Sequence, residues 1–225
     1  MAELLMQMSA LSRRFALRDG DVIALDDVSC EISRGDRIAI VGPSGSGKST
    51  LLAMIAKLDE PSDGHIAWPG LGNPEDLRPR HIGLAFQTPS LIPALTVAEN
   101  VEVPLLILDG MDDPRDAALA ALDRLQLAHL ADRLPEELSG GQAQRIAVAR
   151  ALVTQPDLLL ADEPTGQLDQ STGQSLIHLL VEHAERTNTA LVIATHDPAI
   201  ARQMKSVWRM DHGKLEMGRR LRAVS

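Results

Sequence analysis

Aromatic residues and cysteine are scarce in this chain of 225 residues, and tyrosine does not occur. Aromatic residues make up 2% of the sequence, so stacking on a nucleotide base must use one of four side chains, Phe15, Phe86, Trp68 or Trp208. The single cysteine, Cys30, excludes an intrachain disulfide and a Cys-x-x-Cys metal pair.

Basic residues and long apolar runs are also limited. Lysine and arginine number 22 against 31 acidic residues, and a net charge of −9 disfavours a nucleic-acid surface, which needs clustered basic side chains. The exception is Arg219-Arg220-Leu221-Arg222, which we interpret as a solvated tail, with contact to anionic lipid as the alternative. No apolar run approaches the roughly 18 residues that span a bilayer, and the N-terminus lacks a signal-peptide pattern. We expect a cytoplasmic protein.

Apolar patterning predicts an α/β domain. The first 35 residues alternate apolar and polar side chains, as antiparallel strands do. A short apolar strand at 37–41 leads into a glycine-rich segment, and a helix is expected over 48–58. Further strands are expected at 64–68 and 81–86.

From about residue 88 to 151 the pattern becomes helical, with a capping box at Thr96 and Glu99. Strand and helix then alternate again, with strands expected at 157–162 and 190–195 and a helix between them at 175–186. The sequence therefore predicts a parallel α/β core that is interrupted by an inserted helical subdomain.

The segment between the strand at 37–41 and its following helix is a candidate phosphate loop. Its glycines let successive backbone N–H groups face one concavity, and the helix adds its positive N-terminal end. Lys48 would reach the β- and γ-phosphates, and the Ser49 hydroxyl would ligate Mg²⁺. The expected nucleotide-binding residues here are Gly42, Pro43, Ser44, Gly45, Ser46, Gly47, Lys48, Ser49 and Thr50.

An acidic pair ends the apolar strand at 157–162. Asp162 would hold Mg²⁺, directly or through water, and Glu163 would polarise the attacking water. Pro164 restricts the backbone of Glu163 and helps to fix the direction of its carboxylate. A solvated acidic loop is the alternative for this pair considered alone.

A third segment, Ser139-Gly140-Gly141-Gln142, opens the last helix of the helical region. Ser139 is a good N-cap, and the two glycines expose backbone N–H groups, which makes this helix start an anion site. Taken alone, the segment also fits an ordinary capped helix. Its extension through Leu152 and its order after the phosphate loop and before the acidic pair resemble the ATP-binding-cassette (ABC) ATPases.

The resemblance implies roles for further residues. Gln87 looks like the glutamine that contacts Mg²⁺ or the attacking water, and His196 looks like the switch histidine that contacts the γ-phosphate. The segment 166–169 resembles the loop through which two copies communicate. Phe15 stands where the family places an aromatic residue for adenine stacking, with packing in the core as the alternative.

The implied fold is an α/β fold with a P-loop (RecA-like) parallel-sheet core, an N-terminal antiparallel β subdomain and an inserted α-helical subdomain. One ATP-binding domain would span residues 1–225, with the core and β subdomain in about 1–87 and 152–225 and the helical subdomain in about 88–151. The implied cofactors are ATP and Mg²⁺. Two copies, or one copy and a homologous cassette, would enclose ATP head to tail.

The branch of the superfamily and the partners are also implied. Residues 86–101 and 162–169 resemble the branch of lipoprotein-release, macrolide-export and cell-division ATP-binding subunits, although Gln167 stands where that branch usually has Asn. The chain would lie on the cytoplasmic face of the cell membrane and drive separate permease subunits. The alternatives are a clamp that regulates a membrane or cell-wall complex, an importer and a non-hydrolysing sensor. A nucleic-acid partner is not expected.

Overall fold

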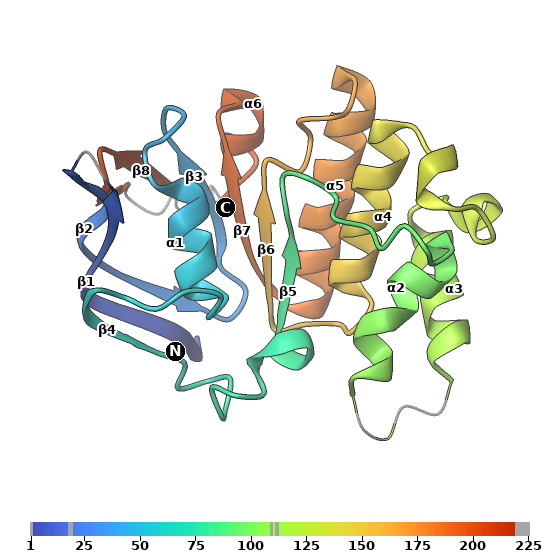
Figure 1. Cartoon of the computed structure of the whole chain (residues 1–225), viewed down its shortest axis with the longest axis horizontal. Coiled ribbons are helices and arrows are strands. Elements are labelled where there is room, and N and C mark those ends of the chain that lie inside the picture. Colours follow the sequence, from blue (N-terminus) through green and yellow to red (C-terminus); the bar gives the residue numbers. More distant parts are fainter. Residues whose placement is uncertain (1, 18–19, 109, 111–112, 219–225) are drawn as a thin grey trace, which may run out of the picture.

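A computed structural model describes residues 2–17, 20–108, 110 and 113–218 of the chain. The arginine-rich segment 219–222 lies outside the described residues. Figure 1 shows the smaller sheet and α1 at one end of the molecule, the larger sheet through the middle, and α2, α3 and α4 at the other end, with α5 and α4 on one side of the larger sheet.

The larger sheet has six strands in the order β5-β6-β7-β3-β8-β9. All neighbouring pairs are parallel except the last, β8 with β9. The strands are β3 (Arg37–Val41), β5 (Ile82–Ala85), β6 (Leu158–Asp162), β7 (Ala190–Thr195), β8 (Ser206–Asp211) and β9 (Lys214–Met217). Every residue of β6 and β7 is buried, because the sheet is covered on both faces.

The smaller sheet is antiparallel, in the order β2-β1-β4. Its strands are β1 (Leu4–Leu17), β2 (Gly20–Ser33) and β4 (Asp63–Ala67). Its apolar face joins α1 (Lys48–Ile55) and the near face of the larger sheet in one core cluster that includes Leu5, Leu51 and Val192. The predicted β subdomain and parallel core are both confirmed.

The helical region holds α2 (Val97–Leu106), α3 (Pro114–Arg124) and α4 (Gly140–Leu152), with short turns at Ala128–Leu130 and Pro135–Glu137. The remaining helices are α5 (Gln170–Thr187) and α6 (Pro198–Ala201), and a short helical turn, Leu77–His81, precedes β5. The capping box of Thr96 and Glu99 is present at the start of α2.

Several expected boundaries shift for local reasons. Helix α1 ends at Ile55 rather than at residue 58, where Lys57 adopts a left-handed φ of 51°. Helix α5 begins at Gln170 rather than at 175, because the Asp169 side chain accepts hydrogen bonds from the Ser171 and Thr172 N–H groups. The sequence patterns missed α6, β8 and β9.

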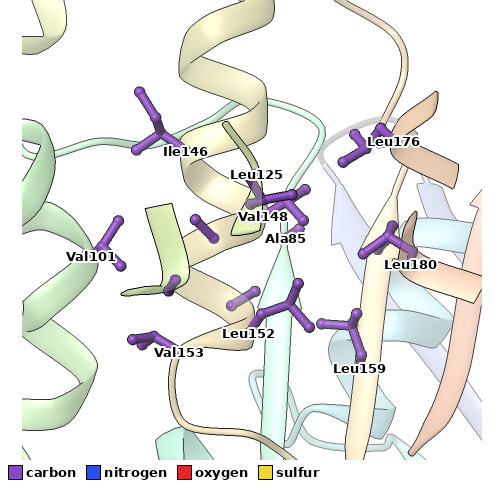
Figure 2. Packing of buried hydrophobic residues seen from close by; sticks show 14 of the residues in the cluster. Ala85, Val101, Leu125, Ile146, Val148, Leu152, Val153, Leu159, Leu176 and Leu180 are labelled. Carbon is purple, nitrogen blue, oxygen red and sulfur yellow. The ribbon is translucent and has the colours of Figure 1, made fainter. Parts of the chain in front are cut away.

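A second core cluster fills the space between the far face of the larger sheet and the helices (Figure 2). Val101 from α2 and Ile146, Val148 and Leu152 from α4 meet side chains of the sheet and of α5. This packing fixes the helical region against the carboxyl half of the chain.

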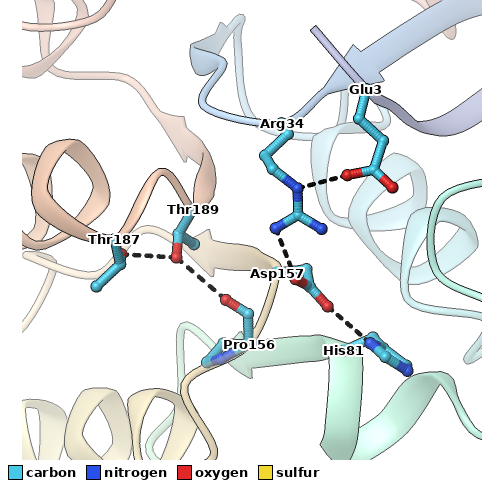
Figure 3. Close-up of polar contacts among 7 residues, drawn as sticks. All are labelled: Glu3, Arg34, His81, Pro156, Asp157, Thr187 and Thr189. Atoms are coloured by element: carbon cyan, nitrogen blue, oxygen red, sulfur yellow. Dashed lines mark hydrogen bonds and ion pairs between the residues drawn. The ribbon is translucent and has the colours of Figure 1, made fainter.

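A polar network joins the two sheets at the amino ends of the parallel strands (Figure 3). The Arg34 guanidinium donates to Glu3 and to Asp157 at 2.7 Å each, and His81 Nδ1 lies 2.7 Å from the other Asp157 oxygen. The network lies at the sheet edge opposite the glycine-rich loop, so it supports the fold rather than the candidate site.

Candidate nucleotide-binding and catalytic site

The glycine-rich loop connects β3 to α1, as the sequence predicts. Gly45 and Gly47 have φ values of +77° and +105°, which side chains other than glycine rarely adopt. Lys48 is 8% exposed, and its Nζ donates hydrogen bonds to the Gly42 and Pro43 carbonyl oxygens at 2.9 Å each. The ammonium group therefore lies across the loop that the phosphates of a nucleotide would occupy.

The β8–β9 hairpin packs against this loop, a contact that the sequence patterns missed. The Gly213 N–H donates to the Ser46 carbonyl at 3.0 Å, and the Gly213 carbonyl accepts from the Asp26 N–H at 2.9 Å. A Cβ at Gly42 would collide with the Met210 carbonyl. His212 and Gly213 both have positive φ, as a two-residue hairpin turn requires. The available sequence signal was His-Gly between two segments that alternate apolar and polar residues.

Asp162 lies at the carboxyl end of β6, beside the start of α1. It is 8% exposed, and burial raises the pKa of its carboxyl, with the charge of Glu163 adding to the rise. A hydrogen bond from Ser49 and the charge of Lys48 act in the opposite direction. The structure thus brings together the hydroxyl and carboxylate oxygens that the sequence assigned to a metal, and hard oxygen donors of this kind fit Mg²⁺.

Glu163 and His196 come from the ends of adjacent strands. His196 Nδ1 lies 3.0 Å from Glu163 Oε1 and 2.9 Å from Oε2. The Glu163 side chain is 12% exposed and that of His196 is 77% exposed. Glu163 also has a φ of +46°, and its N–H donates to the Ala194 carbonyl at 2.9 Å. The carboxylate is therefore held in a fixed place, while the imidazole has room to turn.

Gln87 is exposed just after β5, and helix α4 holds the segment on which it lies. Gln144 Nε2 donates to the Phe86 carbonyl at 3.2 Å. Arg150 donates to the carbonyl oxygens of Ser90 and Pro89 at 3.0 Å each. Gln144 and Arg150 were not among the predicted site residues, because their role depends on contacts across about sixty positions of sequence.

The segment Ser139–Gln142 opens α4 with a capping box, in which the Gln142 N–H donates to Ser139 Oγ at 3.2 Å and the Ser139 N–H donates to Gln142 Oε1 at 2.9 Å. A Cβ at Gly141 would lie 2.9 Å from Leu168 Cδ2, and one at Gly140 would lie 3.2 Å from Gln167 Oε1. The two glycines therefore let the loop after Glu163 pack closely on the start of α4.

Phe15 and Phe86 are the exposed candidates among the four aromatic residues, because Trp68 and Trp208 are buried. Phe86 lines the groove between the helical region and the core, whereas Phe15 is 37% exposed and carries the Arg13 guanidinium 4.5 Å above its ring. Arg13 pairs with Leu25 in β2, and a Cβ at Gly47 would contact Leu25. The ring is thus on the hairpin that borders the loop.

Two further features concern metal clusters and membrane-spanning helices in the described part of the chain. Among the described residues, no group of three or more His, Cys, Asp or Glu side chains is arranged to hold a metal ion. Within the same part of the chain, no helix has the length and apolar character needed to cross a membrane.

Fold and site together define a P-loop nucleotide-binding protein of the α/β class. A family model described as ABC transporter matches residues 25–166, more than half of the chain. The chain belongs to the ABC transporter family as an ATP-binding cassette, and it is an ATPase.

Relatives and solved structures agree with this assignment. The lipoprotein-releasing system ATP-binding protein LolD of Shewanella oneidensis is 40% identical over 228 residues, covering 96% of this chain and 98% of that protein. The protein of the same name from Pseudomonas syringae pv. tomato is 44% identical over 202 residues, covering 86% and 89%. A dimeric cassette in a post-hydrolysis state, bound to ADP and Pi, matches with a TM-score of 0.91 at 35% identity, covering 97% of this chain and 100% of that one.

Proposed function

We propose that two copies of this chain enclose two ATP molecules head to tail and drive membrane subunits that extract lipoproteins from a membrane. The observation that carries the dimer is the likeness to a dimeric cassette bound to ADP and Pi, which covers 97% of this chain at 35% identity. The phosphate loop, Asp162, Glu163 and His196 form one cluster, whereas the atoms nearest to Gly140 and Gly141 belong to Gln167 and Leu168. In such a dimer, the anion site at the start of α4 would serve a nucleotide held by the second copy.

Within one copy, the glycine-rich loop and Lys48 bind the phosphates of ATP. Phe15 stacks on the adenine, and His196 contacts the γ-phosphate after turning away from Glu163. Glu163 accepts the proton of the attacking water, which Gln87 helps to orient. Positioning and electrostatic stabilisation supply most of the catalysis in this type of reaction.

Ser49, Asp162 and Gln87 would hold Mg²⁺, which neutralises charge on the phosphates when it is bound. Support for this assignment comes from the Ser49–Asp162 hydrogen bond and the burial of Asp162. A buried carboxylate with a raised pKa becomes favourable once a cation is bound, so the site is suited to bind metal together with nucleotide.

A groove between the helical region and the core is the proposed contact with the membrane subunits. Its volume is about 410 Å³, and its lining includes Phe86, Val103, Pro104, Ile107 and Arg150. Arg150 also holds the segment after Gln87, so a partner in this groove would be linked to the residue proposed to orient the attacking water. Leu91 and Ile92, which belong to the segment 86–101 that resembles the lipoprotein-release branch, lie outside the lining, and Leu91 packs against the core.

The cargo follows from the relatives. Both of the relatives described above are lipoprotein-releasing subunits matched over most of their length, which favours release of a lipoprotein over the clamp of the cell-division branch. The chain would then act at the cytoplasmic face of the membrane, on permease subunits that bind the lipoprotein.

The test uses Glu163→Gln, purified with ATP and Mg²⁺ from gently solubilised membranes, with identification of the proteins that accompany it. Ile107→Asp in this background should lose a co-purifying multi-span membrane protein. Leu106→Asp is the matched control, because Leu106 and Ile107 are 65% and 66% exposed but only Ile107 lines the groove. A dimer that binds ATP without any membrane protein would refute the proposed coupling and leave the ATPase assignment intact.

A further inference from the structure

A second groove lies along α5, away from the phosphate loop, where the end of α3 and one side of α4 meet that helix. Two adjoining cavities, of about 480 and 220 Å³, share Arg124, Leu125, Leu179 and Glu182 in their walls. Leu125 and Leu152 are buried in the adjoining core (Figure 2), so the floor of the groove is apolar.

The rim of this groove is basic, although the chain as a whole carries a net charge of −9. Arg124, Arg145 and Arg186 contribute to it, and none of the three forms an ion pair with another described residue. Glu182 is the single carboxylate in the lining of the two cavities. Three arginines against one glutamate leave the groove with an excess of positive charge.

Unsatisfied polar atoms also gather here. Within the described part of the chain, buried side-chain atoms without a hydrogen bond occur on Arg37, Ser46, Gln144, Arg145 and His183. Ser46 and Gln144 belong to the nucleotide site and to the contact with the Gln87 segment, whereas Arg145 and His183 both line this groove. His183 is 8% exposed, and burial, with the charges of Arg186 and Arg124, lowers the pKa of its imidazole. Buried polar atoms normally find partners, so the groove has the character of an incomplete contact.

The shape of the groove points to one kind of occupant. Its lining runs along α5 from Thr172 to Arg186 through positions three or four residues apart, a length of about 21 Å at the helical rise. An elongated apolar channel with basic edges fits an amphipathic helix of three to four turns that carries acidic side chains beside its apolar face. We propose that this groove receives an acidic amphipathic helical segment of a protein partner.

Such a segment would join parts of the chain that belong to different subdomains. Arg124 and Arg145 are on the helical region, and Arg186 is on the helix that follows the loop 166–169. Arg145 also lies on α4, the helix that Ser139 caps. A bound acidic helix would thus bias the position of the helical region relative to the core, independently of the coupling groove at Ile107.

The experiment places a photo-crosslinking amino acid at His178, an exposed residue of the groove lining, in the full chain within native membranes and cytoplasm. The partner peptides cross-linked to position 178 are sequenced for the chain with its native arginines and for the groove variant Arg124→Glu/Arg186→Glu. The matched control is Arg202→Glu/Arg209→Glu, which makes the same charge change at two exposed arginines outside the groove.

The expected adduct is a net-negative segment with apolar side chains at helical spacing, reduced at least tenfold by the groove variant and unchanged by the control. Lysine substitutions at the acidic positions of that segment should restore the adduct to the groove variant. Absence of an adduct, adducts only with lipid or with another copy of this chain, or an adduct insensitive to Arg124→Glu/Arg186→Glu would overturn the proposal. Because Ile107 is not altered, these outcomes are independent of the coupling to the permease.

Discussion

Glu163 and His196 face each other across the ends of two neighbouring parallel strands, with Nδ1 of the imidazole 3.0 Å from one carboxylate oxygen and 2.9 Å from the other. The backbone fixes the glutamate, through an N–H donated to Ala194 and a carbonyl that accepts from Gly166. Its positive φ costs on the order of 1 kcal/mol, a strain typical of functional positions. The exposed histidine is therefore the partner that can move when a phosphate arrives.

Glu163→Gln keeps the shape of the side chain but removes its ability to accept a proton. We expect steady-state ATP turnover to fall at least about 100-fold, the lower range for general-base catalysis. ATP should then stabilise a dimer, detectable by size-exclusion chromatography with light scattering. Glu216→Gln, on the exposed strand β9, is the control. Turnover at the wild-type rate would remove Glu163 from the role of base.

Local sequence patterns were sufficient to predict many of the structural elements that carry the candidate site. The phosphate loop, the acidic pair at the end of β6, the capping box at Thr96 and the N-cap at Ser139 each depend on residues within a few positions of one another. The geometry of such motifs can be predicted from the local sequence, because turn and cap preferences are set by neighbouring backbone groups.

The supports of the site could not be predicted in the same way. Gly213 and Met210 hold the phosphate loop, and Gln144 and Arg150 hold the segment of Gln87, through contacts between elements far apart in sequence. Nothing in the local pattern around these residues distinguishes a loop support from an ordinary polar or turn residue. Only the packing of the parallel sheet brings them together.

Gly141→Ala tests the contact between the start of α4 and the loop after Glu163. The added Cβ would lie 2.9 Å from Leu168 Cδ2, and overpacking of this kind typically costs about 1–3 kcal/mol. We expect a lower melting temperature and weaker ATP-dependent dimerisation. Leu168→Ala in the same chain should restore both, because it removes the obstructing methyl group. Gly140→Ala, which meets the flexible end of Gln167, should have a smaller effect. A double variant no better than Gly141→Ala would show that the contact with Leu168 is not the cause.

Asp157→Asn should weaken the network at the far edge of the sheet in a pH-dependent manner. Burial alone would raise the pKa of Asp157, but hydrogen bonds from His81 and Arg34 outweigh it, and the net pKa is lowered. The stabilisation by the charged form is therefore present above the unfolded pKa of about 3.9 and is lost as the pH falls through the folded value. Urea unfolding should show a free energy of unfolding lower than that of the wild type by on the order of 1 kcal/mol at pH 7. This difference between variant and wild type should become smaller at pH values below 4. A difference that stays constant with pH would contradict the ionic origin.

Asp162→Asn should raise the stability of the ligand-free chain at pH 7, the opposite of the effect of Asp157→Asn, because burial raises the pKa of Asp162. The protonated form is favoured in the folded chain, so its contribution to stability is present below the unfolded pKa and is lost as the pH rises through the folded value. At pH 7 the ligand-free Asp162→Asn variant should therefore melt at a higher temperature than the wild type, with about 2–4 °C for each kcal/mol gained. ATP with Mg²⁺ should stabilise the wild type further and the variant much less, and ATPase activity should be lost. Thermal unfolding with and without ATP and Mg²⁺ measures both effects. A variant that is less stable than the wild type at pH 7 would mean that the hydrogen bond from Ser49 and the charge of Lys48 outweigh the penalty of burying the carboxylate.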